Sequence, residues 1–487
     1  MIKIVAGPSM SRIFDPNSDM SFEQYQSLRF HLSYEYKNNF FRKRHNRFLP
    51  DRKFLITEKR MEFQTGLLHR VKEMCDTLSI EYEVEDRRLP GPVDHFMPLK
   101  AEATMRDYQQ DSIDAAVTEM QGMVHMATGG GKTRVIAGII GTLERNAVVL
   151  VHRLDLMHQV LGVLNDLMLY PEVIGRVGGG VYEPNLVTVC TVQTICHALG
   201  INYEDGEDDD DEKPKGGKAH ADAIREMLDK AQVMIVDEAH HAPARTISEV
   251  MKMCPNAAWR IGMSATDWRD DGADLLIEAA VGPRIISITI SDLVDRGFLV
   301  PADIFMEPQH APAHGCDSDN WQSIYKHFYT DNNRFHWQVY ERNAEALAEG
   351  RHVLTLVTSV AHGDRLKSLH RQQGIECEYL SGRDTEWKRK EVLADVRAGR
   401  LRCLIGTSIA DEGLDLPILD TLNLAGGGTS TTKTYQRIGR ILRPYEGKER
   451  GRVYDYRPRS LQKLKEKAGR RASIYRKERC FAFKEAK

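Results

Sequence analysis

The chain has 487 residues, of which 41% are hydrophobic and 28% are charged, and its net charge is −3. This composition is typical of globular proteins, the length predicts about three domains, and no apolar run is long enough to cross a bilayer. The eight cysteines are scattered without a Cys-x-x-Cys pair, which argues against a zinc site and a disulfide framework. Met1–Gly7 lacks the apolar core of a signal peptide. We therefore expect a cytoplasmic protein with no membrane partner.

Residues 1–98 predict a small α+β domain that ends near the linker signal Leu89–Val93. The spacing of apolar residues in this region predicts short strands and helices. In chain order, the expected elements are the strand Met1–Ala6, the helix Phe22–Tyr36, the strand Lys53–Thr57, the helix Gly66–Leu78 and the strand Ser79–Val84.

Residues 99–300 alternate strand-like and helical stretches, and residues 301–458 repeat the alternation. The strands expected in the first block are Ala147–Val151, Val187–Val192, Val233–Val236 and Arg260–Met263. Those expected in the second block are Val353–Val357, Glu376–Leu380, Cys403–Gly406 and Thr421–Leu424. This alternation predicts parallel sheets covered by helices on both faces, hence an α/β fold with two similar domains.

Two charged segments stand apart from these blocks. An insert at about 203–219 contains the acidic run Glu204–Glu212, which is typical of a solvated loop. Residues 459–487 form a basic tail, for which a solvated helix and a contact with a polyanion are equally favoured. Separate blocks of charge can bind a polyanion even where the mean charge is negative.

The most informative segment is Met126–Arg134, in which three glycines precede Lys132 and Thr133. Glycines let the backbone wrap closely round a phosphate group, with several N–H groups pointing inward. Lys132 would reach the β and γ phosphates of ATP, and the Thr133 hydroxyl would hold Mg²⁺. A helix that begins here adds its dipole. The alternative, a glycine-rich turn before a helix, is disfavoured by the carboxylate motif that follows.

An apolar strand, Val233–Val236, ends in two carboxylates, Asp237 and Glu238. A parallel strand that carries acids past its carboxyl end delivers them beside a glycine-rich phosphate loop. Asp237 would hold Mg²⁺ through water, and Glu238 would orient and deprotonate the attacking water. A helix-capping acidic pair is the alternative interpretation, and the upstream glycine-rich loop favours catalysis.

The segment Gln436–Arg443 has helical spacing, which places Arg440 and Arg443 on one helix face. Two guanidinium groups turned toward a cleft could stabilise a γ-phosphate from a second domain, as arginine fingers do. Considered alone, the segment favours a surface helix with solvated arginines.

Together, and in this order, these segments resemble the motif set of the superfamily 2 helicases, over about Ala103–Tyr456. The resemblance implies two tandem RecA-like parallel-sheet motor domains, 99–300 and 301–458, after a small N-terminal α+β accessory domain expected to bind DNA. The implied nucleotide-binding residues are Arg106, Gln109, Thr128, Gly129, Gly130, Gly131, Lys132, Thr133, Arg134, Gly413 and Asp415. The implied metal ligands are Thr133 and Asp237, for Mg²⁺.

The same resemblance assigns three further sets of residues. The implied catalytic residues are Lys132, Asp237, Glu238, His240, Gln436, Arg440 and Arg443. The implied nucleic-acid contacts are His152, Arg153, Thr191, Gln193, Arg269, Thr358, Thr407 and Ser408. The residues implied to couple hydrolysis to movement are Ser264, Ala265 and Thr266.

Finer features resemble the XPB and UvsW branch, whose members act on duplex or branched DNA. Arg269–Asp271 follows the coupling motif, Gln436 rather than His opens the last motif, and Leu424–Gly428 precedes that motif. We predict an ATP- and Mg²⁺-dependent DNA helicase or translocase that remodels branched, forked or duplex DNA, by branch migration, fork regression or D-loop dissociation. Its contacts would be with the backbone and independent of sequence. Recombination or single-strand-binding proteins are candidate partners, in a bacterial cytoplasm or a phage-infected host, near the nucleoid.

Three alternatives stay open. An RNA-dependent ATPase is compatible with Asp237–His240, although Arg269–Asp271 argues against it. A motor subunit of a restriction or defence complex would need a partner nuclease. An ATP-gated scaffold with an inactive motor is disfavoured because Lys132, Glu238 and Arg440 are intact.

The basic stretch Tyr36–Arg60 could hold a duplex or stack at a DNA junction. We favour packing in the domain core for its phenylalanines, namely Phe40, Phe48 and Phe54. A phosphate-binding face and a solvated surface are equally favoured for its cations, namely Arg42, Lys43, Arg44, Arg47 and Arg52.

Overall fold

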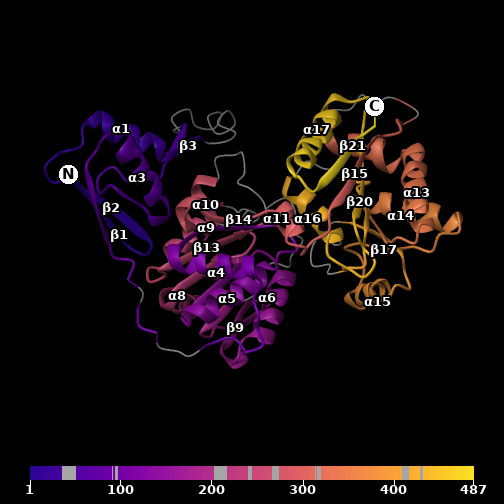
Figure 1. Cartoon of the computed structure of the whole chain (residues 1–487). Coiled ribbons are helices and arrows are strands. Elements are labelled where there is room, and N and C mark those ends of the chain that lie inside the picture. The colour runs from indigo at the N-terminus through magenta and orange to yellow at the C-terminus, as the bar shows by residue number, and fades with distance from the viewer. Residues whose placement is uncertain are drawn as a thin grey trace. The chain divides into compact units, whose positions relative to one another are not determined.

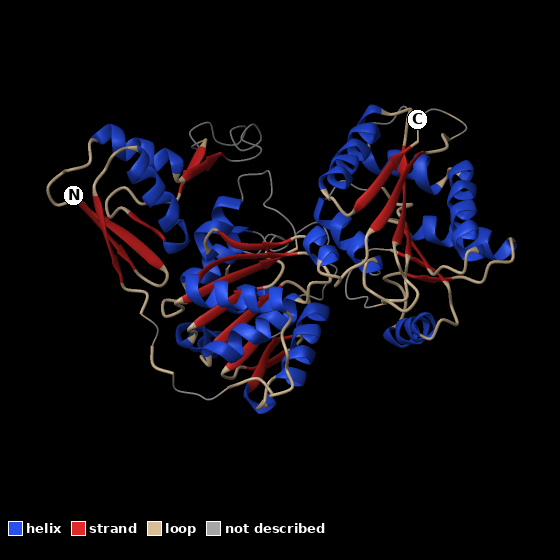
Figure 2. Cartoon of the chain, viewed as in Figure 1, coloured by secondary structure: helices blue, strands red, loops and turns tan. Residues whose placement is uncertain are grey.

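The structure is a computed structural model that describes residues 1–35, 51–89, 91–93, 97–201, 217–239, 244–265, 274–312, 314, 320–407, 416–427 and 431–486. The chain forms two compact units, one of Met1–Met126 with Gly131–Ser287 and one of Ala127–Gly130 with Ile288–Lys487. Figures 1 and 2 show the elements of each unit. None of the helices within the described ranges is long and apolar enough to span a membrane.

The N-terminal domain is built on a small mixed sheet with the strand order β5-β2-β1-β6. Its strands are β1 (Ile2–Ala6), β2 (Met10–Phe14), β5 (Glu62–Gln64) and β6 (Tyr82–Asp86). Every second residue of β1 is buried, so one face of the sheet is apolar. Helices α1 (Phe22–His31) and α3 (Leu68–Thr77), with the 3₁₀ turn Thr65–Leu67, contribute Leu28 and Val71 to the same core.

A hairpin of β3 (Ser33–Glu35) and β4 (Arg52–Phe54) follows α1. The helix expected to reach Tyr36 therefore ends at His31, and the strand expected at Lys53–Thr57 ends at Phe54. The strand expected from Ser79 begins at Tyr82. Ser79 has a left-handed backbone with φ of 54°, which is incompatible with a strand.

The N-terminal domain packs on helix α10 (Asp274–Val281) of the first motor domain. Gly66 lies so close to this helix that a Cβ atom would be 2.2 Å from the carbonyl oxygen of Glu278. Leu275 of α10 is buried in the core of the N-terminal domain. The carboxylate of Glu278 accepts hydrogen bonds from Nε and Nη2 of Arg70 at 2.6 and 2.8 Å. An apolar contact and a buried carboxylate therefore attach this domain to the first motor domain.

The first motor domain has a sheet with the strand order β10-β9-β11-β8-β12-β13-β7-β14. Its strands are β7 (Gln121–Met126), β8 (Ala147–Val151), β9 (Ile174–Gly178), β10 (Val181–Glu183), β11 (Val187–Thr191), β12 (Val233–Val236), β13 (Trp259–Ser264) and β14 (Arg284–Ile288). Its helices include α4 (Asp107–Glu119), α5 (Lys132–Leu143), α6 (Leu154–Leu167), α7 (Val192–Leu199), α8 (Ala221–Lys230) and α9 (Ala244–Lys252). Strands β8, β11 and β12 are parallel and buried throughout, and helices cover both faces of the sheet, as predicted (Figure 2).

The second motor domain has a sheet with the strand order β17-β18-β16-β19-β20-β15-β21, and the strand pairs in it are parallel. Its strands are β15 (Ala302–Pro308), β16 (Val353–Leu356), β17 (Glu378–Leu380), β18 (Cys403–Gly406), β19 (Thr421–Asn423), β20 (Gly451–Arg457) and β21 (Phe481–Glu485). Its helices include α11 (Ile290–Asp295), α12 (Trp321–Tyr325), α13 (Asn333–Ala348), α14 (Val360–Gln372), α15 (Glu386–Arg397), α16 (Thr431–Ile441) and α17 (Gln462–Lys477). The predicted α/β class with two parallel-sheet motor domains is confirmed.

The segment 459–487, expected as a basic tail, is part of this second domain instead. Strand β21 pairs with β15, and α17 carries a stripe of buried residues that includes Leu464 and Tyr475. Arg471 of this helix is 3% exposed and forms a bidentate ion pair with the fully buried Asp455 at 2.7 and 2.8 Å. The abundant Lys and Arg residues on the solvent side of α17 conceal this stripe in the sequence.

Candidate functional site

The glycine-rich loop connects β7 to α5 at the carboxyl edge of the first sheet. Gly129 and Gly131 have left-handed backbones, with φ of 90° and 83°, and Gly131 is the N-cap residue of α5. A Cβ atom on Gly131 would be 2.5 Å from Nε2 of Gln109. The left-handed conformation favours glycine at both positions, and the absence of a side chain on Gly131 leaves room for Gln109. The loop therefore ends at a helix N-terminus, where backbone N–H groups can bind a phosphate.

The residues predicted to flank the nucleotide lie beside this loop. Gln109 in α4 is 1% exposed, and its Oε1 accepts a hydrogen bond from the backbone N–H of Arg106 at 3.0 Å. Arg134 in α5 donates from Nη2 to the carbonyl of Thr104 at 2.8 Å. The segment before α4 and the glycine-rich loop are thus brought together, as the sequence implied.

Lys132 and Glu238 form an ion pair through Nζ and Oε1, and each side chain is 12% exposed. Asp237 follows β12 and is buried. Burial and the neighbouring Glu238 raise the pKa of Asp237 to about 6, while Lys132 opposes the rise. Glu238 has a left-handed backbone with φ of 48°, which is uncommon outside glycine and typical of functional positions. Three predicted catalytic residues therefore meet at one point.

These residues fit a triphosphate with its magnesium ion. The Oγ1 atom of Thr128 in the loop is buried and has no hydrogen-bond partner among the residues that the structure describes, so a phosphate oxygen could satisfy it. Mg²⁺ is usually bound by one or two protein oxygens together with substrate phosphates. Thr133 and Asp237 can supply those protein oxygens.

The coupling segment lies next to the carboxylates because β12 and β13 are neighbouring parallel strands. Ser264 and Ala265 are buried, at 4% and 5% exposure. The backbone N–H of Ala239 donates to the carbonyl of Met263 at 3.1 Å. This hydrogen bond joins the residue after the two carboxylates to the residue before Ser264.

Residues predicted to contact nucleic acid in the first domain gather at the carboxyl ends of β8 and β11. Nε2 of Gln193 donates to the carbonyl of His152 at 2.5 Å, and Arg153 precedes the first residue of α6. Thr191 is 4% exposed, and its hydroxyl is hydrogen-bonded to that of Thr194 at 2.7 Å. The hydroxyl of Thr191 is therefore positioned by Thr194, and its contact with a phosphate stays a prediction.

The corresponding residues of the second domain lie at the carboxyl ends of β16 and β18, which are neighbouring strands. Thr358 is exposed, and its backbone N–H donates to the hydroxyl of Tyr325 at 3.2 Å. Thr407 is 7% exposed, and its backbone N–H donates to the carbonyl of Leu380 at 3.1 Å. Thr358 is therefore the more accessible of the two.

The last motif lies partly on helix α16. Gln436 and Arg440 are in this helix, which ends at Ile441. Arg443 lies beyond the helix, so the prediction that Arg440 and Arg443 share one helix face is wrong. Pro444 follows Arg443, and a residue before proline is disfavoured in helical geometry. Burial lowers the pKa of Arg443.

Six predicted site residues lie outside the described ranges, namely His240, Thr266, Arg269, Ser408, Gly413 and Asp415. The same holds for most of the basic N-terminal stretch, including Phe40, Phe48, Arg42, Lys43, Arg44 and Arg47.

A basic cavity of about 600 Å³, which the sequence did not predict, lies at the carboxyl ends of β15, β20 and β21. Arg457, Arg459 and Lys465 line it, together with Glu485. The alternating pattern of Phe481–Glu485 could have predicted strand β21. This strand contributes Glu485 to the lining of the cavity.

Two RecA-like domains, with a phosphate loop and two carboxylates on the first, define a nucleotide-driven motor. The family model "Type III restriction enzyme, res subunit" matches residues 102–268, and "Helicase conserved C-terminal domain" matches residues 338–445. The chain is a superfamily 2 helicase, and its closer sequence relatives include proteins of the XPB type.

Putative helicase 22 of the Sulfolobus islandicus filamentous virus is 27% identical over 72% of this chain and 64% of its own length. The chain therefore spans slightly less than two thirds of that relative. The DNA 3'-5' translocase XPB2 of Sulfurisphaera tokodaii is 25% identical over 75% of this chain and 84% of its own length. The structure of Dbp5 from S. cerevisiae bound to RNA and ADP BeF3 aligns with 78% of this chain and 89% of its own, with a TM-score of 0.52 and 15% identity. This last likeness concerns the fold alone.

Proposed function

We propose that this helicase is an ATP-driven DNA translocase that remodels branched or duplex DNA. The observation that carries the proposal is the ion pair of Lys132 and Glu238 beside the buried Asp237, at the N-terminus of α5. The similarity to XPB-type DNA translocases supports DNA as the substrate. Recombination or repair is the context in which such remodelling is needed.

In the proposed cycle, the phosphates of ATP replace Glu238 as the partner of Lys132. The released carboxylate of Glu238 then orients the attacking water and accepts its proton. Mg²⁺, held by Thr133 and Asp237, would neutralise phosphate charge. Arg440 and Arg443 would add positive charge from the second domain.

The proposed strand contacts lie at the carboxyl edge of each sheet, with His152 and Gln193 on the first domain. Thr358 and Thr407 are their counterparts on the second domain. Ligands of open α/β sheets bind at these edges. Contacts with the DNA backbone make the affinity salt-dependent and largely independent of sequence. The N-terminal domain would supply a further DNA contact.

A second candidate is the motor subunit of a restriction complex, because the first family model is that of a type III restriction subunit. Under this proposal a partner chain would supply the nuclease. The isolated chain would then hydrolyse ATP slowly, whichever DNA substrate is added.

The test is ATP hydrolysis by the purified chain with single-stranded DNA, duplex DNA, a four-way junction and RNA at matched nucleotide concentration. Lys132→Ala serves as the blank. We expect the junction or forked DNA to stimulate hydrolysis most strongly. Strongest stimulation by RNA would contradict DNA as the substrate, and the absence of stimulation by any polymer would favour the subunit candidate.

A further inference from the structure

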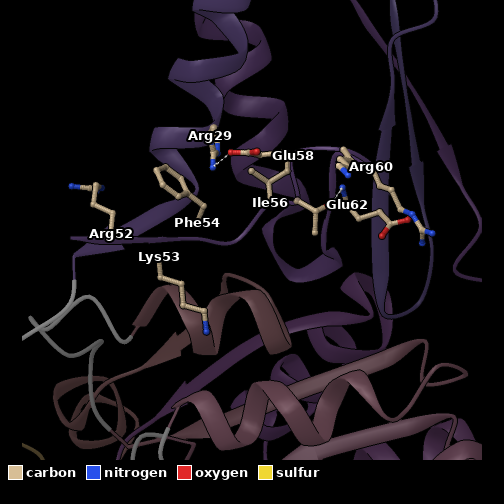
Figure 3. A pocket seen from close by; sticks show the side chains of 10 residues that line it. Arg29, Arg52, Lys53, Phe54, Ile56, Glu58, Arg60 and Glu62 are labelled. Atoms are coloured by element: carbon tan, nitrogen blue, oxygen red, sulfur yellow. Dashed lines mark hydrogen bonds and ion pairs between the residues drawn. The ribbon is translucent and has the colours of Figure 1, made fainter. Parts of the chain in front are cut away.

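A basic groove lies on the N-terminal domain, between α1, the β3–β4 hairpin and the turn that leads to β5 (Figure 3). Its volume is about 830 Å³. The cations among its described lining residues are Arg29, Arg52, Lys53, Lys59 and Arg60. They outnumber the two carboxylates, so the groove is positively charged and suits an anionic ligand.

Three of these cations are available to a ligand. The side chains of Lys59 and Arg60 are exposed, and among the residues that the structure describes they have no ion-pair or hydrogen-bond partner. Lys53 likewise has no acidic partner at ion-pair distance; Arg245 and Lys252 of α9 lie near it, and the weaker influence of Glu249 on the same helix opposes these two cations. Burial and these two cations lower the pKa of Lys53. An approaching phosphate would relieve this repulsion.

Two aromatic rings accompany the cations. Phe54 is 37% exposed, and the guanidinium of Arg29 lies 4.1 Å from the centre of its ring. Glu58 forms an ion pair with Arg29 and so holds the guanidinium against the ring (Figure 3). Phe54 is therefore a surface residue, and the prediction that it packs in the core is wrong. The residue belongs to a short hairpin whose pairing, not its hydrophobicity, decides which side the ring faces.

The second ring is that of Phe30, which is 59% exposed and adjoins the groove through Arg52 without lining it. The guanidinium of Arg52 lies 4.1 Å from its centre, and Glu35 holds this guanidinium through an ion pair of 2.8 Å. Each ring therefore makes a cation–π contact with an arginine, and part of each ring is exposed to solvent. Exposed rings beside a cationic groove are the features with which proteins bind single-stranded nucleic acid.

We propose that this groove binds a single strand of DNA, with its phosphates on Lys53, Lys59 and Arg60 and unpaired bases against Phe54 and Phe30. The proposal rests on the proposed function and deepens it by adding a strand site outside the motor domains. A duplex would bring phosphates but no accessible base faces, so the rings favour an unpaired arm of a fork. Because α10 anchors this domain, the bound arm would be tied to the first motor sheet.

The test uses the full-length chain without nucleotide, and fluorescence anisotropy with labelled oligothymidylate and a blunt hairpin duplex across a salt series. The variant is Lys59→Gln with Arg60→Gln. Its matched control is Lys72→Gln with Arg87→Gln. Lys72 lies on α3, and Arg87 directly follows β6, which is at the opposite edge of the sheet from β5. We expect the single-strand slope of log K against log salt to become shallower by about 1.4, since each lost phosphate contact contributes about 0.7. The control variant should keep the wild-type slope.

A second variant, Phe54→Ala, probes base stacking. Its affinity for oligothymidylate should fall roughly 5- to 150-fold, the range expected for one stacked base, with no change for the duplex. A single-strand slope unchanged by Lys59→Gln with Arg60→Gln, or an equal loss of single-strand and duplex affinity in Phe54→Ala, would overturn the groove assignment. If the wild type itself neither binds DNA nor hydrolyses ATP faster with it, the proposed function fails instead.

Discussion

Replacing Glu278 by Gln should loosen the N-terminal domain from the first motor domain. The carboxylate of Glu278 is 7% exposed and receives three short contacts, two from Arg70 and one from Nε2 of His69 at 2.6 Å. Burial by itself raises the pKa of Glu278, but the hydrogen bonds from His69 and Arg70 outweigh it, so the pKa lies below its ordinary value. The charged form is therefore the one that stabilises the fold.

The size of the effect follows from this geometry. A net hydrogen bond to a charged group stabilises by about 1.5–3 kcal/mol. Arg70 and His69 are 32% and 35% exposed, so water screens part of the interaction and compensates both donors after the change. We therefore expect Glu278→Gln to lower the free energy of unfolding by about 2 kcal/mol in all. Because the folded pKa is depressed, this contribution is present above the unfolded pKa and is lost as pH falls through the folded value.

A double-mutant cycle of Glu278→Gln and Arg70→Met measures the coupling directly, by urea unfolding and by limited proteolysis of the N-terminal domain. The control cycle uses Glu226 and Lys230, an exposed i,i+4 pair within α8, for which a coupling of at most about 0.5 kcal/mol is expected. A coupling energy for Glu278 and Arg70 that is indistinguishable from the control would refute the reasoning.

Three further changes test the motor domains. Glu238→Gln should slow ATP hydrolysis roughly 10²- to 10⁴-fold while a fluorescent ATP analogue still binds; equal loss of binding would contradict its role as the base. Asp455→Asn leaves the charge of Arg471 buried and should cost about 3–5 kcal/mol in urea unfolding, and a cost below that of an exposed pair would contradict this. His362 is buried, and burial holds its pKa well below the ordinary value. Below about pH 6.5 the unfolded chain therefore binds a proton at His362 that the folded chain does not bind. The free energy of unfolding then falls by up to about 1.4 kcal/mol per pH unit. His362→Gln should flatten this acid loss of stability, and an unchanged pH profile would count against the argument.

The nucleotide site was largely readable from the sequence because its chemistry is local. Gly129–Gly131, Lys132 and Thr133 are consecutive, and a loop before a helix can place them in few ways. Asp237 and Glu238 follow a run of apolar residues that had to be a buried strand. The structure places Lys132 against Glu238, as their order implied.

The same holds for the two α/β domains, whose central strands are continuous apolar runs. Val233–Val236 and Cys403–Gly406 were predicted with the bounds that the structure gives. A strand buried on both faces needs such a run, so the pattern and the fold are physically linked.

Other features were decided only by tertiary structure, because they depend on partners far apart in the chain. Glu278 and Arg70 are separated by 208 positions, and nothing local marks either as half of a buried pair. Helix α17 looks polar because its apolar stripe is narrow. The pairing of β21 with β15 shows that the segment 459–487 belongs to the second domain. Phe54 is apolar and yet exposed, since its direction follows from the hairpin and not from its hydrophobicity. The sequence by itself therefore determined the motor and its nucleotide loop, whose chemistry is contiguous, and the three-dimensional packing decided how the N-terminal domain is attached and which of its side chains face solvent.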